Sequence, residues 1–244
     1  MSMLHNASHR KIFRAHVGFL NFVIPNFLCL FFGQTWNTYF FHHVKHHHVE
    51  DNGRGDLSST ASFQRDSITH FLIYFGRFFL LIHIELPYYF FARKQFIFAA
   101  HALFGELLSL FGYATAFFVW PYPTLFVFVF PFVLMRFFMM AANWGQHAFI
   151  NNSAKHAHSL TILKSSYNTV AFNDGYHASH HENSQRHWSE HPVAEISKVF
   201  LAGFLWRNVK LICRSMLRFE ISHSVVTLSL AMCGSFSWRK ITIV

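Results

Sequence analysis

The sequence predicts an all-α integral membrane protein, with a transmembrane helical hairpin, interfacial or re-entrant helices and a cytosolic helical cap. Three observations support this prediction. Of the 244 residues, 52% are hydrophobic and only 13% are charged, a balance that soluble domains rarely show. Phenylalanine occurs 33 times, mostly in long apolar stretches. Histidine occurs 20 times and gathers in clusters between those stretches, so the cap is expected to hold a histidine-rich site for two metal ions.

The best candidates to span the membrane are Phe96–Trp120 and Thr124–Ala142, which together predict a hairpin over about residues 96–142. A bilayer crossing needs about twenty mostly apolar residues, and both stretches supply them. The junction at residues 120–123 reads Trp-Pro-Tyr-Pro and contains no lysine or arginine. Because prolines end and start helices and Trp and Tyr favour the membrane interface, the turn is expected to face the lumen or exterior.

Two other apolar stretches are not expected to make simple crossings. Val17–Gly33 is short, is interrupted by Pro25, and separates two histidine clusters that must share one side of the membrane to bind one centre. Phe71–Phe91 contains Arg77 and Glu85 and has basic residues before and after it. Charges at bilayer depth are costly and basic residues gather on the cytosolic side, so this stretch is predicted to lie in the interface.

The chain is expected to divide into residues 1–192, which hold every histidine cluster, and residues 193–244. The second part begins with a predicted basic amphipathic helix over Val193–Leu217 and ends in a tail. The formal net charge of +9 is scattered beside apolar runs. No nucleic-acid motif accompanies it, so we expect contact with membrane lipid and not with nucleic acid.

The histidine spacings predict the metal site. The clusters are HNASH at residues 5–9, HHVKHHH at 42–48 and HASHH at 177–181, and NWGQH follows the hairpin at 143–147. Residues three and four apart share a face of a helix, so each motif aims its side chains in one direction. The register within residues 42–48 is open, although His43, His46 and His47 reproduce the spacing of HASHH. The predicted metal ligands are His5, His9, His43, His46, His47, Asn143, His147, His177, His180 and His181.

Acidic residues near the clusters are candidates to accept the second ring N–H of a ligand imidazole and so fix its orientation. Each of them taken singly is better explained as a solvated loop charge. As a group they are Glu50, Asp51, Asp174, Glu182 and Glu190. Beyond the metal ligands, the sequence predicts no catalytic residue and no site for an organic cofactor.

In these motifs the chain resembles the membrane fatty acid desaturase and hydroxylase superfamily, whose hallmark is HxxxH, HxxHH and HxxHH boxes around a non-haem di-iron centre. The closest similarity is to the acyl-CoA desaturase branch, which also has an NxxxH element like NWGQH. The resemblance covers His5 to about Pro192 and marks residues 1–192 as a desaturase-like catalytic domain. It implies two iron ions as cofactors, a fatty acyl lipid and O2 as substrates, and a cytosol-facing site in the endoplasmic reticulum membrane.

The implied function is oxygen-dependent desaturation of a fatty acyl chain in lipid metabolism and fatty acid biosynthesis. An alkyl C–H bond is neither acidic nor electrophilic, so acid/base catalysis alone does not break it and a metal with O2 is needed. The HPGG haem-binding signature is absent from the sequence. Electrons are therefore expected from a separate donor, a b-type cytochrome or a ferredoxin with its reductase.

Three alternatives stay open at the level of sequence. A lipid or acyl hydroxylase would use the same scaffold, because both reactions begin by removing the same hydrogen. A histidine-rich metal transporter would belong to a different class, and would pair acidic or histidine ligands across several spanning helices. An inactive remnant is the third, because family members carry a spanning hairpin ahead of the first box and this chain is expected to be truncated there.

Overall fold

The structure is a computed structural model that describes residues 2–150, 159–163, 165–195 and 197. In this part of the chain all regular structure is helical apart from an isolated β-bridge between Thr161 and Tyr176, which confirms the all-α prediction. The chain divides after Pro192, and the first unit contains nearly all of the described residues. Apart from its first residues, the predicted amphipathic helix Val193–Leu217 lies outside the described part, as does the tail.

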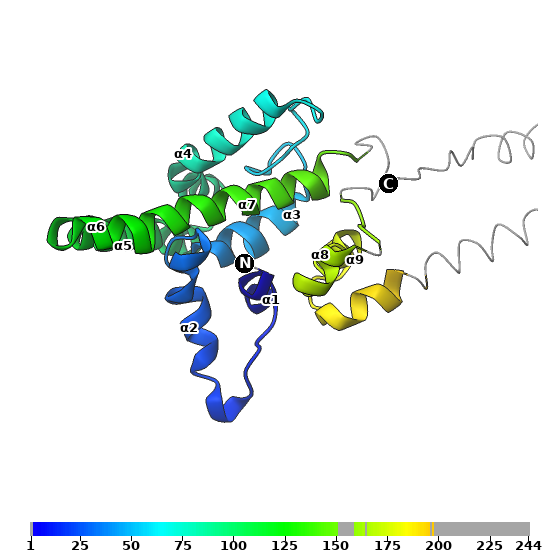
Figure 1. Ribbon diagram of the computed structural model, residues 1–244, viewed down its shortest axis with the longest axis horizontal. Coiled ribbons are helices and arrows are strands. Elements are labelled where there is room, and N and C mark those ends of the chain that lie inside the picture. Colours follow the sequence, from blue (N-terminus) through cyan, green and yellow to red (C-terminus); the bar gives the residue numbers. More distant parts are fainter. Residues whose placement is uncertain (1, 151–158, 164, 196, 198–244) are drawn as a thin grey trace, which may run out of the picture. The chain divides into compact units, whose positions relative to one another are not determined.

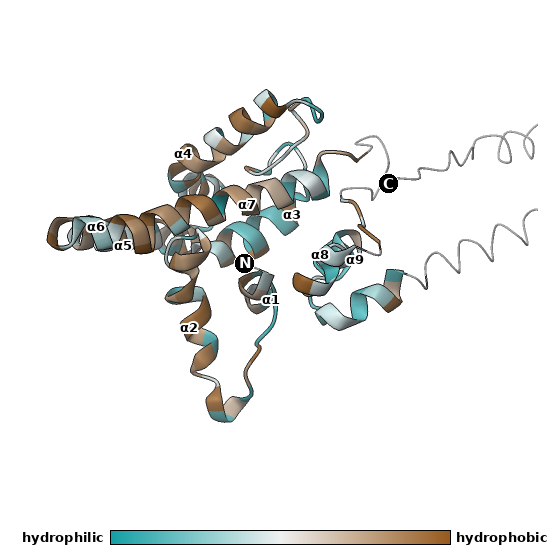
Figure 2. Ribbon diagram, viewed as in Figure 1, coloured by the Kyte–Doolittle hydropathy of each residue, from teal (hydrophilic) through white to brown (hydrophobic). Residues whose placement is uncertain are grey.

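Three helices in the described part are long and apolar enough to cross a membrane. Helix α4 is Ile68–Ala92 and α5 is Phe96–Val119. The third is a continuous run of α6 (Pro121–Thr124), the π-helix η4 (Leu125–Val129) and α7 (Phe130–His147). Figure 2 shows apolar residues concentrated along these helices. The chain is therefore an integral membrane protein, and the predicted hairpin consists of α5 and the run that ends in α7.

Helix α4 contains the stretch that was predicted to lie in the interface. Its first turn is capped by Ser67, whose side chain accepts a hydrogen bond from the backbone N–H of His70. The helix continues through Pro87, and the charges of Arg77 and Glu85 pair at 2.7 Å. Pairing lowers the cost of placing both charges among apolar residues. By length and composition α4 is a third candidate span, and its interfacial position stays a prediction.

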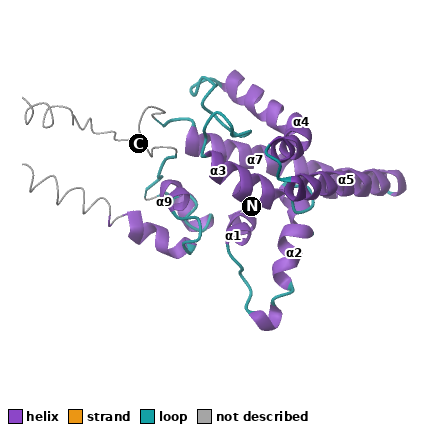
Figure 3. Cartoon of the chain, turned by 180° about the vertical axis from the view of Figure 1, so that it is seen from behind, coloured by secondary structure: helices purple, strands orange, loops and turns teal. Residues whose placement is uncertain are grey.

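The chain between the first two histidine clusters folds into short helices. Helix α1 (Ser2–His9) packs on α2 (Leu20–Asn26), and η2 (Leu28–Phe32) packs on α7. Figures 1 and 3 show α1 between α2 and α9. Gly33 ends η2 with φ of 76°, and a Cβ there would lie 2.5 Å from the backbone nitrogen of Arg136. Only glycine allows this approach. The series of short helices between the two clusters is consistent with the predicted re-entrant segment.

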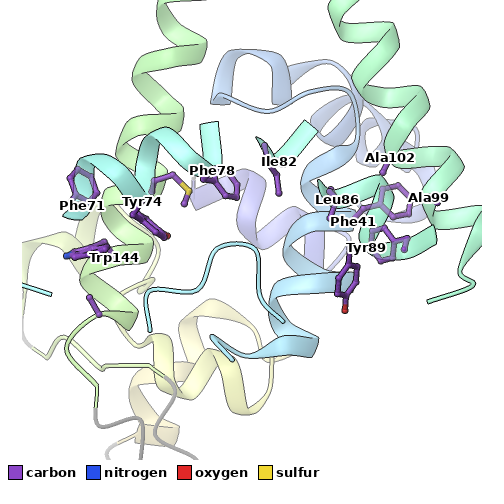
Figure 4. Packing of buried hydrophobic residues seen from close by; sticks show 13 residues of the cluster. Phe41, Phe71, Tyr74, Phe78, Ile82, Leu86, Tyr89, Ala99, Ala102 and Trp144 are labelled. Carbon is purple, nitrogen blue, oxygen red and sulfur yellow. The ribbon is translucent and has the colours of Figure 1, made fainter. Parts of the chain in front are cut away.

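An aromatic core anchors the second histidine cluster to the spanning helices. The cluster lies on a π-helix, η3 (Phe40–His47), followed by one α-helical turn, α3 (His48–Glu50). Phe41 of η3 packs on Phe90 of α4, with ring centroids 6.2 Å apart, and Figure 4 shows Phe41 beside Leu86 and Ala99. With its apolar side held in this core, η3 presents histidines on the other side.

The cap consists of α8 (Ser166–Val170), α9 (His177–Glu182) and η5 (Trp188–Glu190). Between α8 and α9 the chain turns at Asn173, which adopts φ of 57° and whose carbonyl accepts a hydrogen bond from the backbone N–H of Tyr176 at 2.9 Å. Asparagine tolerates this left-handed conformation well. Asp174 lies in this turn, three residues before α9 begins, so the turn places a carboxylate beside the third histidine cluster.

Candidate metal centre

The structure brings nine histidines into two groups, each compact enough to hold a metal ion. Within each group, one ring nitrogen per residue lies within 4.8 Å of all the others. Helix α1, the η3–α3 segment, α7 and α9 supply them, so sequence positions from 5 to 181 meet in one place. The first group is His5, His9, His43, His48 and His180. The second group is His47, His147, His177 and His181.

The π-helical geometry of η3 decides which histidines of HHVKHHH enter the groups. A π-helix bonds residue i to residue i+5 and so has more than four residues per turn. His43, His47 and His48 therefore share a face and reach the two groups. His46 lies outside both groups, and its Nε2 accepts a hydrogen bond at 2.8 Å from the backbone N–H of Leu57. His48 was absent from the predicted ligands because His43, His46 and His47 were chosen to reproduce the spacing of HASHH.

Carboxylates fix the orientation of three group histidines. Asp174 lies 2.7 Å from Nδ1 of His5, and Asp51 lies 2.8 Å from Nδ1 of His181. An ionised carboxylate only accepts, so each Nδ1 carries the proton and each Nε2 keeps its lone pair. Burial would raise the pKa of Asp174, but the hydrogen bond from His5 and that from the Tyr167 hydroxyl outweigh it, and the pKa is lowered. Asp174 and Asp51 were in the predicted acidic group.

The third carboxylate, Asp56, was not predicted. It lies 2.7 Å from Nδ1 of His47 and also accepts the hydroxyl of Ser58 at 2.7 Å. Burial would raise the pKa of Asp56, yet His47 and His46 hold it well below its usual range. Glu50, which was predicted, turns away and accepts hydrogen bonds from Tyr89 and Arg93. The sequence signal for Asp56 is the pair of glycines before it, which let the chain fold back over the second cluster.

The ring nitrogens within each group approach one another closely. His180 Nε2 lies 2.8 Å from His5 Nε2 and 3.0 Å from His48 Nε2. In the second group, His177 Nε2 lies 3.0 Å from His147 Nε2 and 3.1 Å from His181 Nε2. Two nitrogens bound at right angles to one metal ion at about 2.1 Å are about 3.0 Å apart. The observed spacings therefore fit nitrogen ligands around a cation.

Two further properties support a metal in each group. Burial, followed by neighbouring imidazoles, lowers the pKa of His43, His177, His180 and His181 well below the ordinary histidine range. These side chains are therefore neutral, as metal ligands must be. Both ring nitrogens of His9 and Nε2 of His47 are buried with no hydrogen-bond partner. Buried polar atoms left unpaired are costly, and a metal ion would satisfy them.

Asn143, the predicted amide ligand, lies one helical turn before His147 but belongs to neither group. Its side-chain nitrogen donates to the Tyr74 hydroxyl at 2.6 Å and to the backbone carbonyl of Ser58 at 3.1 Å. It lines the cavity described next, beside His47 and His177. The structure thus places Asn143 next to the second group, with its amide nitrogen engaged elsewhere.

An apolar cavity of about 270 Å³ ends at both histidine groups. Helix α7 contributes most of its apolar lining, and the histidines close its polar end. His42, which is buried and belongs to neither group, also lines it. A hydrocarbon chain placed here would lie directly against both metal-binding groups. Its apolar lining includes Phe138, Met139, Met140 and Ala142, and its group histidines are His5, His43, His47 and His177.

Comparison with known proteins identifies one family. The sequence model of the fatty acid desaturase family matches residues 1–205, which include all four elements that supply the histidines. The match also extends beyond Pro192, where the first structural unit ends. No curated protein and no solved structure matches the chain.

Proposed function

Because this chain belongs to the fatty acid desaturase family of oxidoreductases, we propose that it uses O2 to introduce a double bond into a fatty acyl chain at a di-iron centre. Nine converging histidines at the end of an apolar cavity carry the proposal. The substrate class and O2 follow from the family. We further propose an acyl-CoA as the form of the substrate, and the endoplasmic reticulum membrane, with the centre facing the cytosol, as the location.

We assign one iron to each histidine group. The five histidines of the first group and the four of the second include eight of the ten ligands predicted from sequence, with His48 added and His46 and Asn143 left out. When bound, iron would supply the redox chemistry with O2 that no side chain provides. Asp174, Asp56 and Asp51 hold a proton on Nδ1 of their histidines and keep Nε2 directed inward.

The cavity residues select the bond that reacts. Phe138, Met140 and Ala142 of α7 would pack along the acyl chain and exclude water from the reacting methylenes. Removal of two hydrogen atoms from adjacent carbons with reduction of O2 to two waters consumes two further electrons and two protons. We propose that a separate one-electron donor, a b-type cytochrome or a ferredoxin with its reductase, supplies these electrons.

The test is production of unsaturated lipid in a desaturase-deficient host, read by mass spectrometry. We expect a new double bond with the full chain, and loss of both product and about one bound iron with His48→Ala. The matched variant His46→Ala removes a neighbouring imidazole that lies outside both groups, and should keep both irons. An alcohol as the only product would identify a hydroxylase. Equal iron loss in both variants would contradict the ligand assignment.

A further inference from the structure

A tyrosine of the cap is joined to a metal-binding histidine through one carboxylate. The hydroxyl of Tyr167 on α8 donates a hydrogen bond to Oδ2 of Asp174, and Oδ1 of Asp174 lies 2.7 Å from Nδ1 of His5. His5 belongs to the first histidine group. The three side chains therefore form a continuous hydrogen-bonded path from a phenol to the candidate metal centre. In a buried site, hydrogen bonds in such a chain polarise one another.

The carboxylate in the middle of this path is held firmly. Oδ2 of Asp174 also accepts a hydrogen bond from the side-chain nitrogen of Gln146 on α7 at 2.9 Å. An ionised carboxylate only accepts, so Tyr167, Gln146 and His5 all donate to it. Burial, followed by the charge of Asp174, raises the pKa of Tyr167. The phenol therefore keeps its proton, which stays directed at Asp174.

The path also borders the space proposed for the acyl chain, because Tyr167, Asp174 and His5 all line the apolar cavity. With an acyl chain in the cavity, the C–H bonds of the chain lie nearest to the metal centre. Without one, the side chains of the lining do. The lining side chains most easily oxidised, apart from the ligands, are two phenols and two thioethers. They are Tyr39, Tyr167, Met139 and Met140.

Hydrogen bonding singles out Tyr167 among these four side chains. A phenol gives up an electron readily when its proton leaves at the same time, whereas a thioether has no proton to release. Tyr167 has Asp174 as a proton acceptor. Tyr39 stacks on the ligand His43, with ring centroids 5.0 Å apart and ring planes at 8°. Among the described residues, however, no hydrogen-bond acceptor faces the Tyr39 hydroxyl.

We infer that Tyr167 is a redox-active residue that gives one electron to the oxidised metal centre when no acyl chain fills the cavity. The inference rests on the proposed function, which supplies the iron and O2. The O–H bond of Tyr167 breaks, its electron passes to the centre through Asp174 and His5, and its proton passes to Asp174. A neutral tyrosyl radical remains. The one-electron donor of the proposed reaction then returns an electron, Asp174 returns the proton, and the ligand imidazoles are spared oxidation.

The experiment is freeze-quench EPR on the iron-loaded full chain. The protein is reduced with dithionite, freed of excess reductant and mixed with O2 in the absence of acyl substrate. We expect the signal of an organic radical, which narrows when the protein contains ring-deuterated tyrosine. Tyr167→Phe removes only the hydroxyl and should lose this signal when compared at equal bound iron. Peptide mass spectrometry should then show more oxidised ligand histidine than in the wild type.

The matched control is Tyr176→Phe, which removes a hydroxyl in the same cap that neither lines the apolar cavity nor contacts Asp174. It should keep the radical signal. A signal that persists in Tyr167→Phe, or that both variants lose equally, would overturn the inference. A signal lost only in Tyr39→Phe would also overturn it and would give the role to Tyr39.

Two further outcomes separate this inference from the proposed function. If the same sample forms an unsaturated product with acyl substrate but no tyrosyl radical without it, the inference fails and the proposed function stands. If a radical that depends on Tyr167 forms but acyl substrate is never oxidised, the inference stands and the proposed function fails.

Discussion

Two regions of this molecule bury histidine in opposite ways. Among the long apolar helices, His83 Nδ1 donates to Glu106 at 2.6 Å and its Nε2 accepts from Arg136 at 3.0 Å, so both ring nitrogens are satisfied. In the histidine groups, carboxylates contact Nδ1 of His5, His47 and His181, and Nε2 of His180 lies 2.8 Å from that of His5 and 3.0 Å from that of His48. The difference teaches that burial alone does not identify a ligand. Several ring nitrogens that converge within about 3 Å of one another do indicate a ligand set, because one cation placed among them would satisfy all of them.

The strongest test of this comparison removes a ligand of the second group. His177→Ala should abolish product and lower bound iron from about two per chain toward one, because His177 Nε2 lies beside the ring nitrogens of both His147 and His181. Iron is measured by mass spectrometry on purified protein. Retention of both irons with full turnover would show that the converging ring nitrogens do not bind metal.

Disrupting the contacts of His83 with Glu106 and Arg136 should lower the free energy of unfolding and leave metal binding intact. Arg136→Met removes the cation that reaches Glu106 through His83 and also removes the hydrogen bond to the Gly33 carbonyl. Removing one partner of a buried pair typically costs about 3 kcal/mol or more in the free energy of unfolding. The double variant Arg136→Met/Glu106→Gln should recover part of this loss. A fall in iron per folded chain in either variant would show that the His83 contacts also support metal binding, contrary to the comparison.

Removing a carboxylate that orients a ligand should have an intermediate effect. Asp174→Asn weakens the acceptor of His5 Nδ1–H, and such changes typically lower metal affinity by about 10- to 100-fold. Competition with a chelator measures the affinity. Asp66→Asn, an exposed carboxylate outside the site, is the matched control. The same affinity in both variants would mean that Asp174 does not position His5 for the metal.

The smallest effect is expected at an exposed histidine of α5. His101 Nδ1 contacts the carbonyl of Ile97 at 2.8 Å and belongs to neither group. His101→Gln should keep both irons and shift the free energy of unfolding by about 0.5 kcal/mol or less. Iron content and unfolding are measured together, and loss of an iron would show that histidines outside the two groups also take part.

Much of the fold and of the centre could be predicted, because the signals are local. Apolar length and the Trp-Pro-Tyr-Pro junction predicted the hairpin. Recurrent HxxxH and HxxHH spacing predicted which segments converge. The register of the second cluster could not be predicted, since η3 is a π-helix with more residues per turn than the α-helix on which the spacing rule rests. The place of His48 in the first group and the contact of Asp56 with His47 could be recognised only once the structure showed that register and the turn that follows it.

The pairing of His5 with His180 has a consequence for biosynthesis. These residues lie 175 positions apart in the chain, and a ribosome adds about 5 to 20 residues per second. Roughly ten to thirty-five seconds therefore pass between translation of the first cluster and the last. Throughout that time the early imidazoles lack these later partners. Neither ligand set is complete before the last cluster is made, because the first group includes His180 and the second includes His177 and His181.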